Sequence, residues 1–427
     1  MTNVRDFGAV GDGQVDDTKA LRHAVDQGGG RLVLSRGTYR LTAPLEIDLD
    51  RFGPIALAGE GGTARLLMDG PGPAVRLVGS HDKSADPASF DPRVWRRQRL
   101  PTVSDLEIVG NHDQADGIEL EGTMQATIAG VSIRRCRYGV HLVKRNRNVL
   151  LADSHIYEGR GPAIGVYFDG VNLHQAIITG CHISFCKHAG IKIVRSEIRN
   201  LQITGCDIEY NHDIANPDSA DVWIDSREGT VREGTLASNT IQAKGSPRGA
   251  NVRIEGPSRD DSAGAGFWAI TGNILSDQQV NVWLRNCRGV TLTGNAIASA
   301  YERSILVEHC RDIVIGSNVL DHNPDYPGAI IDGIRVVRSA GVNLQNLILD
   351  GCRAGSPQEG GAIEVVDSSE VLILGCQVLD PEHRGIDVRN CTNTKVSECI
   401  VVDRRARPTM REPIRIVERT GQPGPIA

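Results

Sequence analysis

Residues 281–297 read NVWLRNCRGVTLTGNAI, and both halves of this stretch recur along most of the chain. The first half, NVWLRN (281–286), has apolar residues at its second and fourth positions. The second half, VTLTGNAI (290–297), alternates apolar residues with polar ones before a Gly-Asn pair. Because alternation with a period of two places every second side chain on the same face, both halves are predicted to be β-strands with one buried face.

The first pattern occurs twelve times, at spacings of 22 to 31 residues, as GIELEG (117–122), GVHLVK (139–144), GVYFDG (165–170), GIKIVR (190–195), DVWIDS (221–226), NVRIEG (251–256), NVWLRN (281–286), SILVEH (304–309), GIRVVR (333–338), AIEVVD (362–367), GIDVRN (385–390) and PIRIVE (413–418). A period near 22 with three short strands per turn predicts a solenoid of stacked turns. The second pattern repeats a small polar corner residue, at Cys181, Cys206, Asn239, Asn273, Asn295, Asn318, Cys376 and Cys399. These corners predict a hydrogen-bonded Asn/Cys ladder.

Composition excludes several classes of protein. The chain has 427 residues, 48 of them glycine, and a formal net charge of −6, which argues against nucleic acid as a partner. Its longest apolar runs are too short to cross a membrane, and Met1–Asp6 lacks the apolar core of a signal peptide. The ten cysteines are expected to be reduced and buried. These features favour a cytoplasmic location, or a secreted one if a signal has been trimmed.

The N-terminal segment predicts a cap for the solenoid. Residues 4–26 hold a Gly-rich turn, then Asp16 or Asp17 as a helix cap, and then apolar residues at helical spacing. Residues 28–42 then supply the first strands. The segment 4–42 resembles the N-terminal motif of the pectate-lyase-like superfamily, and the repeats resemble its coils.

This resemblance covers nearly the whole chain and implies a right-handed parallel β-helix. We expect an all-β solenoid of about 12 or more coils with an N-terminal capping helix. It would form a single domain over 1–427, with a cap and first strands in 1–45 and regular coils in 100–420. The superfamily includes polygalacturonases, polysaccharide lyases, alginate epimerases, inulin fructotransferases and phage tailspikes, so a carbohydrate ligand is implied.

The third and fifth positions of the first pattern are predicted to point outward. The third-position column includes two tryptophans, Trp223 and Trp283, which lie two turns and roughly 10 Å apart, with Arg253 between them. Long loops at 209–220, 243–250 and 257–266 interrupt the repeat beside this column. An aromatic wall flanked by loops suits an extended sugar chain. The predicted substrate-binding residues are Trp223, Trp283, Arg253, Arg285, Tyr167, Lys192, His174 and Glu308.

Carboxylates on the fifth-position column are the candidate catalytic groups. Asp225 and Glu255 occupy equivalent positions on successive turns, so their carboxyls are expected about 5 Å apart, with one pKa raised. That spacing favours a retaining glycosidase, whereas Asp169 would be the distant partner of an inverting pair. Glu228, in the adjoining turn, is a further candidate. The competing interpretation is a surface ladder of salt bridges formed by Asp225, Glu255, Arg253 and Arg285.

No metal site is expected, because His141, His174, His212 and His309 lack metal-like spacing. Family motifs give no catalytic assignment either. The Asn-Thr-Asp, Asp-Asp, Gly-His-Gly and Arg-Ile-Lys elements of polygalacturonases and the Tyr-Gly-Phe-Asp-Pro-His element of alginate epimerases are absent. The stretch VWID (222–225) resembles the Trp-Ile-Asp-His element of calcium-dependent pectate lyases, but Ser226 replaces the histidine.

The sequence therefore predicts a glycoside hydrolase that acts on a poly- or oligosaccharide without a cofactor. The first alternative is a polysaccharide lyase, in which Lys192, Arg253 or Arg285 acts as base or neutralises the substrate carboxylate, and acidic residues hold calcium. The second alternative is a non-catalytic, tailspike-like carbohydrate-binding protein. A homo-oligomer, such as a trimer, is compatible with an exposed sheet face.

Overall fold

The computed structural model describes residues 2–83, 86–215, 217–242, 244–258, 264–326 and 328–418. The chain divides into two compact units, Met1–Asn211 and His212–Ala427, and each is described by itself. Both units are parallel β-solenoids, which confirms the predicted fold class. A single domain over 1–427 stays a prediction.

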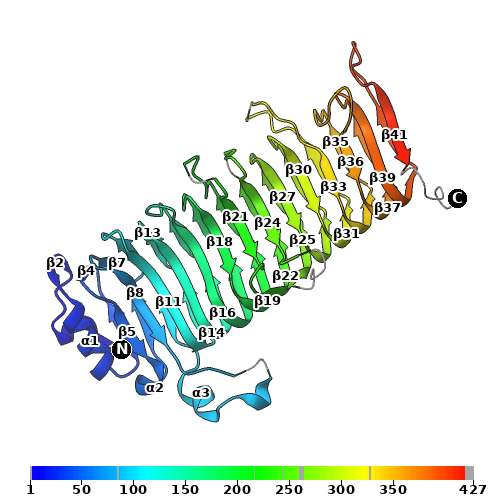
Figure 1. Ribbon diagram of the computed structural model, residues 1–427. Helices are drawn as coiled ribbons and strands as arrows, with labels where there is room; N and C mark the ends of the chain where they lie inside the picture. Colours follow the sequence, from blue (N-terminus) through cyan, green and yellow to red (C-terminus); the bar gives the residue numbers. More distant parts are fainter. Residues whose placement is uncertain are drawn as a thin grey trace. The chain divides into compact units, whose positions relative to one another are not determined.

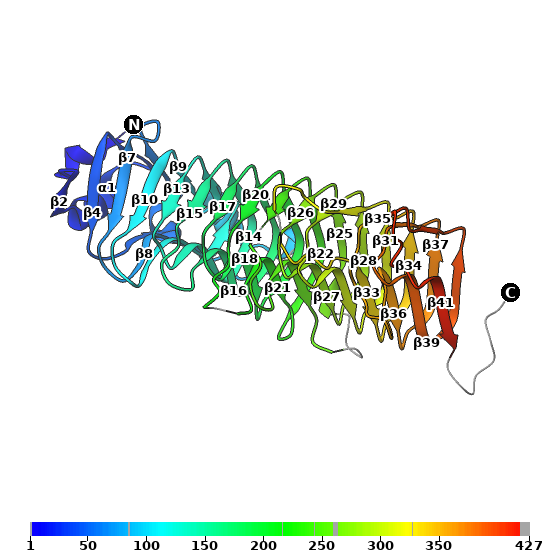
Figure 2. The same ribbon diagram turned by 90° about the horizontal axis from the view of Figure 1, so that it is seen from above.

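Each full turn of the solenoid contributes strands to three parallel runs (Figures 1 and 2). In the first unit, the described strands of the first run are β5 (Leu45–Asp48), β8 (Gly72–Val78), β11 (Ala115–Met124), β14 (Tyr138–Ala152), β16 (Ile164–Thr179) and β18 (Ala189–Val194). The second run has β1 (Thr2–Asn3), β3 (Arg31–Leu34), β6 (Ala56–Gly59), β9 (Thr102–Ser104), β12 (Thr127–Ala129) and β19 (Glu197–Thr204), and β14 and β16 continue into it. The third run has β2 (Asp12–Asp16), β4 (Gly37–Leu41), β7 (Ala64–Met68), β10 (Leu106–Gly110), β13 (Ser132–Arg134), β15 (His155–Tyr157), β17 (His182–Ser184) and β20 (Asp207–Glu209).

The second unit repeats this plan. Its first run is β21 (Ala220–Asp225), β24 (Ala250–Glu255), β27 (Val280–Arg285), β30 (Arg303–Glu308), β33 (Ile334–Val337), β36 (Ile363–Val366), β39 (Arg384–Ser397) and β41 (Glu412–Glu418). The second run is β22 (Thr230–Ala237), β25 (Ala265–Thr271), β28 (Arg288–Thr293), β31 (Arg311–Gly316), β34 (Ala340–Gln345) and β37 (Ser369–Leu374), and β39 continues into it. The third is β23 (Thr240–Gln242), β26 (Ile274–Ser276), β29 (Ala296–Ala298), β32 (Val319–Asp321), β35 (Ile348–Asp350), β38 (Gln377–Leu379) and β40 (Ile400–Val402).

The strand register confirms the predicted outward columns within each unit. In the first unit, Glu119, His141, Tyr167 and Lys192 are successive partners. In the second unit, Trp223, Arg253 and Trp283 are successive partners, as are Asp225, Glu255, Arg285 and Glu308. The second and fourth positions of the pattern face inward and are fully buried, as at Val282 and Leu284. The two-residue period therefore fixes which side chains reach the outer face.

A ladder of buried asparagines confirms the predicted role of the corner residue. In the second unit, the side-chain amide of Asn239 donates to Oδ1 of Asn273 at 2.9 Å, and Asn273 donates to Asn295 at 3.0 Å. Asn295 in turn donates to Asn318 at 2.9 Å. The backbone N–H groups of the first three asparagines donate to the same acceptors. Each amide is thereby satisfied without water.

Cysteine replaces asparagine at several other corners. The Cys181 and Cys206 thiols donate to backbone carbonyls of their own and the preceding turn. All ten cysteines lie in the described part of the chain and none of them forms a disulfide there. Eight are buried and two are half-buried, as the composition predicted.

The predicted N-terminal helix is α1, Thr18–Gln27, which buries Leu21, Ala24 and Val25. One of the two predicted cap residues, Asp17, is confirmed as the N-cap. Its carboxylate, however, accepts from the N–H groups of Val10 and Gly11 in the preceding turn. Asp16 instead accepts from the Thr18 N–H at 3.0 Å. The described helices are otherwise short: α2 (Leu49–Phe52), α3 (Pro92–Arg97), η1 (Val4–Phe7) and η2 (Pro87–Ser89).

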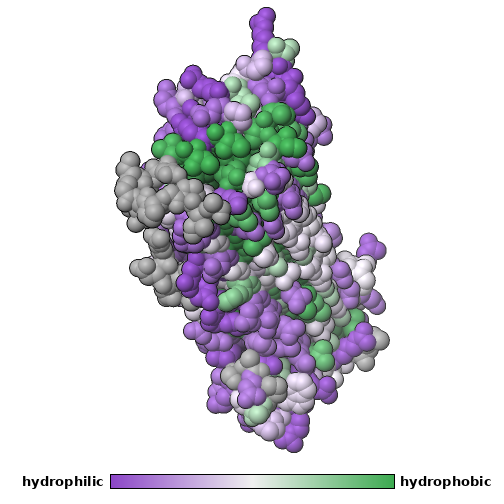
Figure 3. All heavy atoms as spheres, turned by 90° about the vertical axis from the view of Figure 1, so that its right-hand side faces the viewer, coloured by the Kyte–Doolittle hydropathy of each residue, from purple (hydrophilic) through white to green (hydrophobic). Residues whose placement is uncertain are grey.

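The last described turn of the second unit carries apolar residues on its surface. Ile414 and Ile416 continue the inward positions of Ile386 and Val388 in β39, which are buried. Ile416 is nevertheless 51% exposed, because no described turn follows β41. Viewed from the side that carries the C-terminal strands, hydrophobic residues gather on the surface (Figure 3). No described helix is long and apolar enough to span a membrane.

Candidate functional site

The predicted site residues belong to different units. Tyr167, Asp169, His174 and Lys192 lie in the first unit, and Trp223, Asp225, Glu228, Arg253, Glu255, Trp283, Arg285 and Glu308 lie in the second. Each group is therefore considered by itself.

In the second unit, an arginine lies between two tryptophans. The Arg253 guanidinium is 4.5 Å from the ring centroid of Trp223 and 4.5 Å from that of Trp283. Adjacent first-run strands β21, β24 and β27 bring these three residues, here called the tryptophan stack, into contact. Stacking of this kind is a cation–π interaction, which is stronger when the charge is desolvated.

Little of the tryptophan stack is exposed. Trp223 is 5% exposed and Arg253 6%, whereas Trp283 is half-buried. A sugar-binding role for these residues stays a prediction. Asp218, from the predicted cleft loop 209–220, pairs with both Arg253 and Arg248 over the stack. In the three predicted cleft loops, residues 216, 243 and 259–263 lie outside the described part of the chain.

The two predicted catalytic carboxylates are neighbours, and both are charge-paired. Glu255 is buried and accepts from the Trp223 indole N–H at 3.1 Å and from Arg253 at 3.0 Å. Asp225 accepts from the Arg227 guanidinium at 2.8 Å. The alternative interpretation, a ladder of salt bridges, holds for the Arg253–Glu255 pair, whereas the pairing of Asp225 with Arg227 was not part of that ladder.

The remaining predicted residues of this unit surround the tryptophan stack. Trp283 donates its indole N–H to Glu308 at 2.9 Å. Arg285 is exposed and lies in register between Glu255 and Glu308. Glu228 is exposed in the turn after β21. The arrangement holds adjacent turns together and presents Arg285 to solvent.

The first unit holds a second constellation, centred on His141. The His141 ring stacks on Tyr167 with centroids 5.2 Å apart and planes 6° apart. Tyr138 lies against both rings, with centroids at 4.9 and 5.0 Å. These three residues, here called the ring cluster, come from β14 and β16.

Acidic residues flank the His141 imidazole on both sides. Nδ1 lies 3.3 Å from a Glu119 oxygen, and Nε2 lies 3.6 Å from an Asp169 oxygen. The hydrogen bond from His141, followed by the charge of Arg76, holds the pKa of Glu119 below its ordinary value against the cost of burial. Both ring nitrogens of His141 are shielded from solvent.

Groups on the outer side of the ring cluster are suited to proton transfer. Lys192, the register partner of Tyr167, has its Nζ 2.6 Å from Nε2 of His188. His188 and Lys192 are here called the proton pair, because an ammonium at this distance donates a hydrogen bond to a neutral imidazole. Arg195 pairs with Asp169 and hydrogen-bonds the Tyr167 hydroxyl. Burial, with the nearby Asp169 charge, raises the pKa of Tyr167 to about 12.

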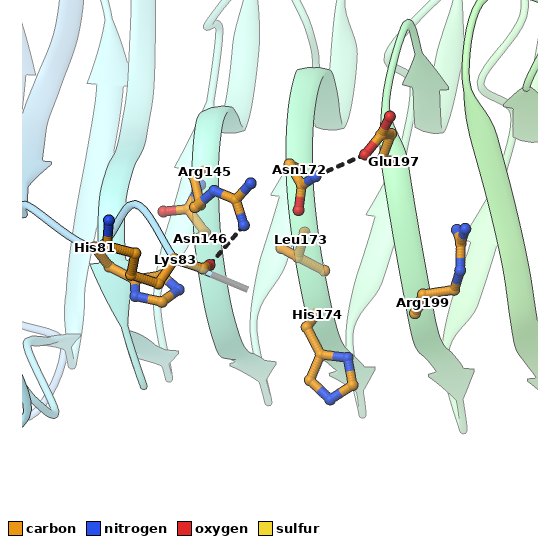
Figure 4. A pocket seen from close by; sticks show the side chains of 9 residues that line it. All are labelled: His81, Lys83, Arg145, Asn146, Asn172, Leu173, His174, Glu197 and Arg199. Atoms are coloured by element: carbon orange, nitrogen blue, oxygen red, sulfur yellow. Dashed lines mark hydrogen bonds between the residues drawn. The ribbon is translucent and has the colours of Figure 1, made fainter. Parts of the chain in front are cut away.

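A basic pocket lies further along β14 and β16 and next to β19 (Figure 4). It has a volume of about 240 Å³ and is lined by His81, Lys83, Arg145, Asn146, Asn172, Leu173, His174, Glu197 and Arg199. His174, predicted at the margin of the site, is one of these residues. The lining has three basic side chains, Lys83, Arg145 and Arg199, and one acidic side chain, Glu197. The Glu197 carboxylate accepts a hydrogen bond from the Asn172 side-chain amide at 2.7 Å. The pocket therefore suits a carboxylate, sulfate or phosphate group.

His81 closes one side of this basic pocket. It is buried, and desolvation lowers its pKa to about 4, with a further contribution from the charges of Arg145 and Arg147. His81 is therefore neutral near pH 7. The Arg145 guanidinium donates to the Lys83 carbonyl at 2.6 Å, which ties the segment after β8 to β14.

Sequence reasoning named Tyr167 and Lys192 but missed their partners Tyr138, His141 and His188. It weighed His141 only for metal-like spacing, although the outward column places Glu119, His141, Tyr167 and Lys192 in succession. Tyr138 and His188 lie just before a six-residue repeat, at positions that the repeat pattern does not include, so the pattern makes no prediction about them.

Comparison with known proteins identifies the class of the chain. The family described as right handed beta helix region matches residues 98–236 and 280–407, more than half of the sequence, so the chain belongs to that family. Residues 1–66 also match the family described as rhamnogalacturonase A/epimerase, pectate lyase-like. The predicted resemblance and the handedness of the helix are thereby confirmed.

Named relatives act on carbohydrates. Mannuronan C5-epimerase AlgE2 of Azotobacter vinelandii is 31% identical over 137 residues, which are 30% of this chain and 12% of that protein. Alginate lyase 7 of the same organism is 34% identical over 137 residues, 30% of this chain and 15% of that protein. The chain thus matches only a small part of each relative's length.

A solved structure supports the fold alone. The pre-mature gene product 12 of bacteriophage phi29 superposes with a TM-score of 0.63 at 13% identity, covering 95% of this chain and 57% of that one.

Proposed function

We propose that this chain is an enzyme that removes a proton next to the carboxylate of an acidic polysaccharide, as a lyase or an epimerase. The observation that carries the proposal is the proton pair at 2.6 Å beside the ring cluster, on strands that lead into the basic pocket. A glycoside hydrolase needs two available carboxylates, and Asp225 and Glu255 are both held by arginines.

The reaction class requires three things of the protein. A cation must neutralise the substrate carboxylate, because this makes the neighbouring C–H acidic enough to lose its proton. A base must take that proton, and an acid must return one, either to the opposite face of the sugar carbon or to the departing glycosidic oxygen. The basic pocket supplies cations for carboxylates along the chain.

Particular side chains suit each role. Lys192 is the base: once its extra proton has passed to Nε2 of His188, the neutral amine takes the substrate proton. Tyr138, half-buried at the edge of the ring cluster, is the acid. Arg195 faces the same side and pairs with the reacting carboxylate, as it does with Asp169. Glu119 and Asp169 hold His141, which keeps the two tyrosine rings in place.

The names of the relatives agree with this class. One is an epimerase of mannuronan and another is an alginate lyase. Both names describe reactions at a uronate unit, which begin with the same proton removal and differ in where the next proton goes. A polysaccharide is accordingly the proposed partner, and oligomerisation remains a prediction.

The test incubates the full chain with polymannuronate, polyguluronate, polygalacturonate and a neutral glucan. Ultraviolet absorbance reports unsaturated lyase products, reducing ends report any cleavage, and deuterium uptake from heavy water reports epimerisation. Lys192→Met and Tyr138→Phe are each expected to lower the rate by roughly 10²–10⁴-fold. Lys187→Met, which changes an exposed lysine five residues from Lys192, is the matched control and should retain the wild-type rate.

The same assay separates the alternatives. The hydrolase predicted from the register pairing of Asp225 and Glu255 would give reducing ends without absorbance and would lose activity in Glu255→Gln. Chelation tests the calcium of the lyase alternative, and we expect no loss because arginine and lysine side chains supply the positive charge. Equal activity of Lys192→Met, Tyr138→Phe and the wild type would refute the proposed centre.

A further inference from the structure

A second cluster of polar side chains lies on the outer face of the third run in the first unit. His182 in β17 is the register partner of Asp207 in β20, and Glu209 projects from β20 two residues further on. The alternation of side chains along a strand places Asp207 and Glu209 on the same face. This face belongs to a different run from the ring cluster, so the proposed polysaccharide reaction does not use it.

The donor atoms of these three residues converge. One atom from each of His182, Asp207 and Glu209 lies within 4.8 Å of the other two. Nε2 of His182 is 3.5 Å from a Glu209 oxygen. Oδ1 of Asp207 is shielded from solvent and has no hydrogen-bond partner in the described structure. Burial, together with the Glu209 carboxylate, raises the pKa of Asp207.

We propose that His182, Asp207 and Glu209 bind a divalent transition-metal ion, with zinc as the representative ion. One imidazole and two carboxylates are donors that such ions accept, whereas calcium prefers oxygen donors alone. Two ligand atoms of a tetrahedral zinc ion lie about 3.4 Å apart, because each bond is close to 2.1 Å. Side-chain rotations that bring the donor atoms closer by up to roughly 1.4 Å therefore close the observed spacing of at most 4.8 Å.

The backbone of the scaffold is fixed, so only the side chains need to move. β17 and β20 are adjacent parallel strands in direct register, so their hydrogen bonds fix the spacing of the side chains. His155, in β15 one turn earlier, has its ring centroid 5.8 Å from that of His182. The ion would offset the repulsion between two neighbouring carboxylates and would link adjacent turns across the surface. Binding to the folded chain alone raises its melting temperature.

The experiment titrates zinc chloride into the full chain after treatment with EDTA, using isothermal titration calorimetry in a buffer that does not bind metals. We expect saturable binding of one ion and a higher melting temperature in zinc. His182→Ala and Asp207→Asn are each expected to weaken binding at least tenfold. Asp207→Asn keeps the shape of the side chain, and circular dichroism confirms that both variants are folded.

A matched control addresses binding at other histidines. His322 also contacts a carboxylate, with Nε2 2.7 Å from an Asp332 oxygen, but it lies outside this cluster. His322→Ala should bind zinc as tightly as the wild type. The proposal is overturned if the wild type shows no saturable binding, if His182→Ala and Asp207→Asn bind as the wild type does, or if His322→Ala alone abolishes binding.

Discussion

Removing the Arg253 side chain tests whether the tryptophan stack holds the second unit together. Arg253 is 6% exposed and its partner Glu255 is 2% exposed, so Arg253→Ala leaves a carboxylate buried without its counter-charge. Breaking a buried pair in this way costs about 3–5 kcal/mol. The two ring contacts at 4.5 Å add roughly 1–2 kcal/mol in total. We expect the free energy of unfolding of the second unit to fall by about 5 kcal/mol.

The assay is urea unfolding followed by tryptophan fluorescence, because two of the four tryptophans contact Arg253 directly. Arg253→Lys keeps the charge but loses the planar contact with both rings, and it should cost about 1–2 kcal/mol. The double variant Arg253→Met with Glu255→Gln removes both charges, and it should be more stable than Arg253→Ala alone.

A loss of less than 1 kcal/mol in Arg253→Ala would refute this reasoning. The reasoning would also be refuted if the effects of Arg253→Met and Glu255→Gln simply added in the double variant. Residues that contact each other are expected to couple by about 0.5–3 kcal/mol. Either result would return Glu255, the partner of Arg253, to consideration as a group available for chemistry.

Three further predictions concern stability and pH. The pKa of His81 is lowered to about 4, so between about pH 6.5 and pH 4 the unfolded chain binds more protons than the folded chain. The stability of the protein should therefore fall as the pH drops through this range. Thermal melts of His81→Gln should show a smaller fall than those of the wild type. Burial raises the pKa of Asp277 to about 6, so the protein should lose stability as the pH rises from about 4 to 6 and the buried Asp277 carboxyl ionises. Asp277→Asn should raise the melting temperature at pH 7.5 and leave it unchanged at pH 4. An equal shift of the melting temperature at the two pH values would contradict this. Asn295→Ala removes the acceptor of Asn273 and should cost about 2–3 kcal/mol in urea unfolding. The substitution Gln377→Ala, at an exposed position of β38, serves as the control and should cost less than about 0.5 kcal/mol.

The sequence was sufficient to predict the turns and their register. Alternation within six residues decides which face of a strand is buried, so it predicts the alignment of Trp223, Arg253 and Trp283 that the strand register shows. The ladder at Asn273 and Asn295 followed from the same local repetition. Both features depend only on neighbouring turns, which a repeat pattern records directly.

The contacts above the outer face were not predictable in this way. Asp218, in a loop of irregular sequence, pairs with Arg253, which stacks on the buried Trp223. Asp225 is paired by Arg227, which lies in the turn after the strand. Loop conformation sets both contacts, and periodicity carries no information about it. The proton pair was missed for the related reason that His188 precedes the repeated segment.

The asparagine ladder also determines how the length of this protein can change. Ala296 and Val319 are register partners, so deleting residues 296–318 would join Asn295 to Val319 with every strand still facing the correct way. Deleting a single residue from the same stretch would instead turn the core side chains outward. Insertions and deletions are therefore tolerated in whole turns, each of which moves surface groups on either side by one step of about 4.8 Å. The spacing between distant sites on such a protein is set by counting turns, and it can be altered without redesigning either site.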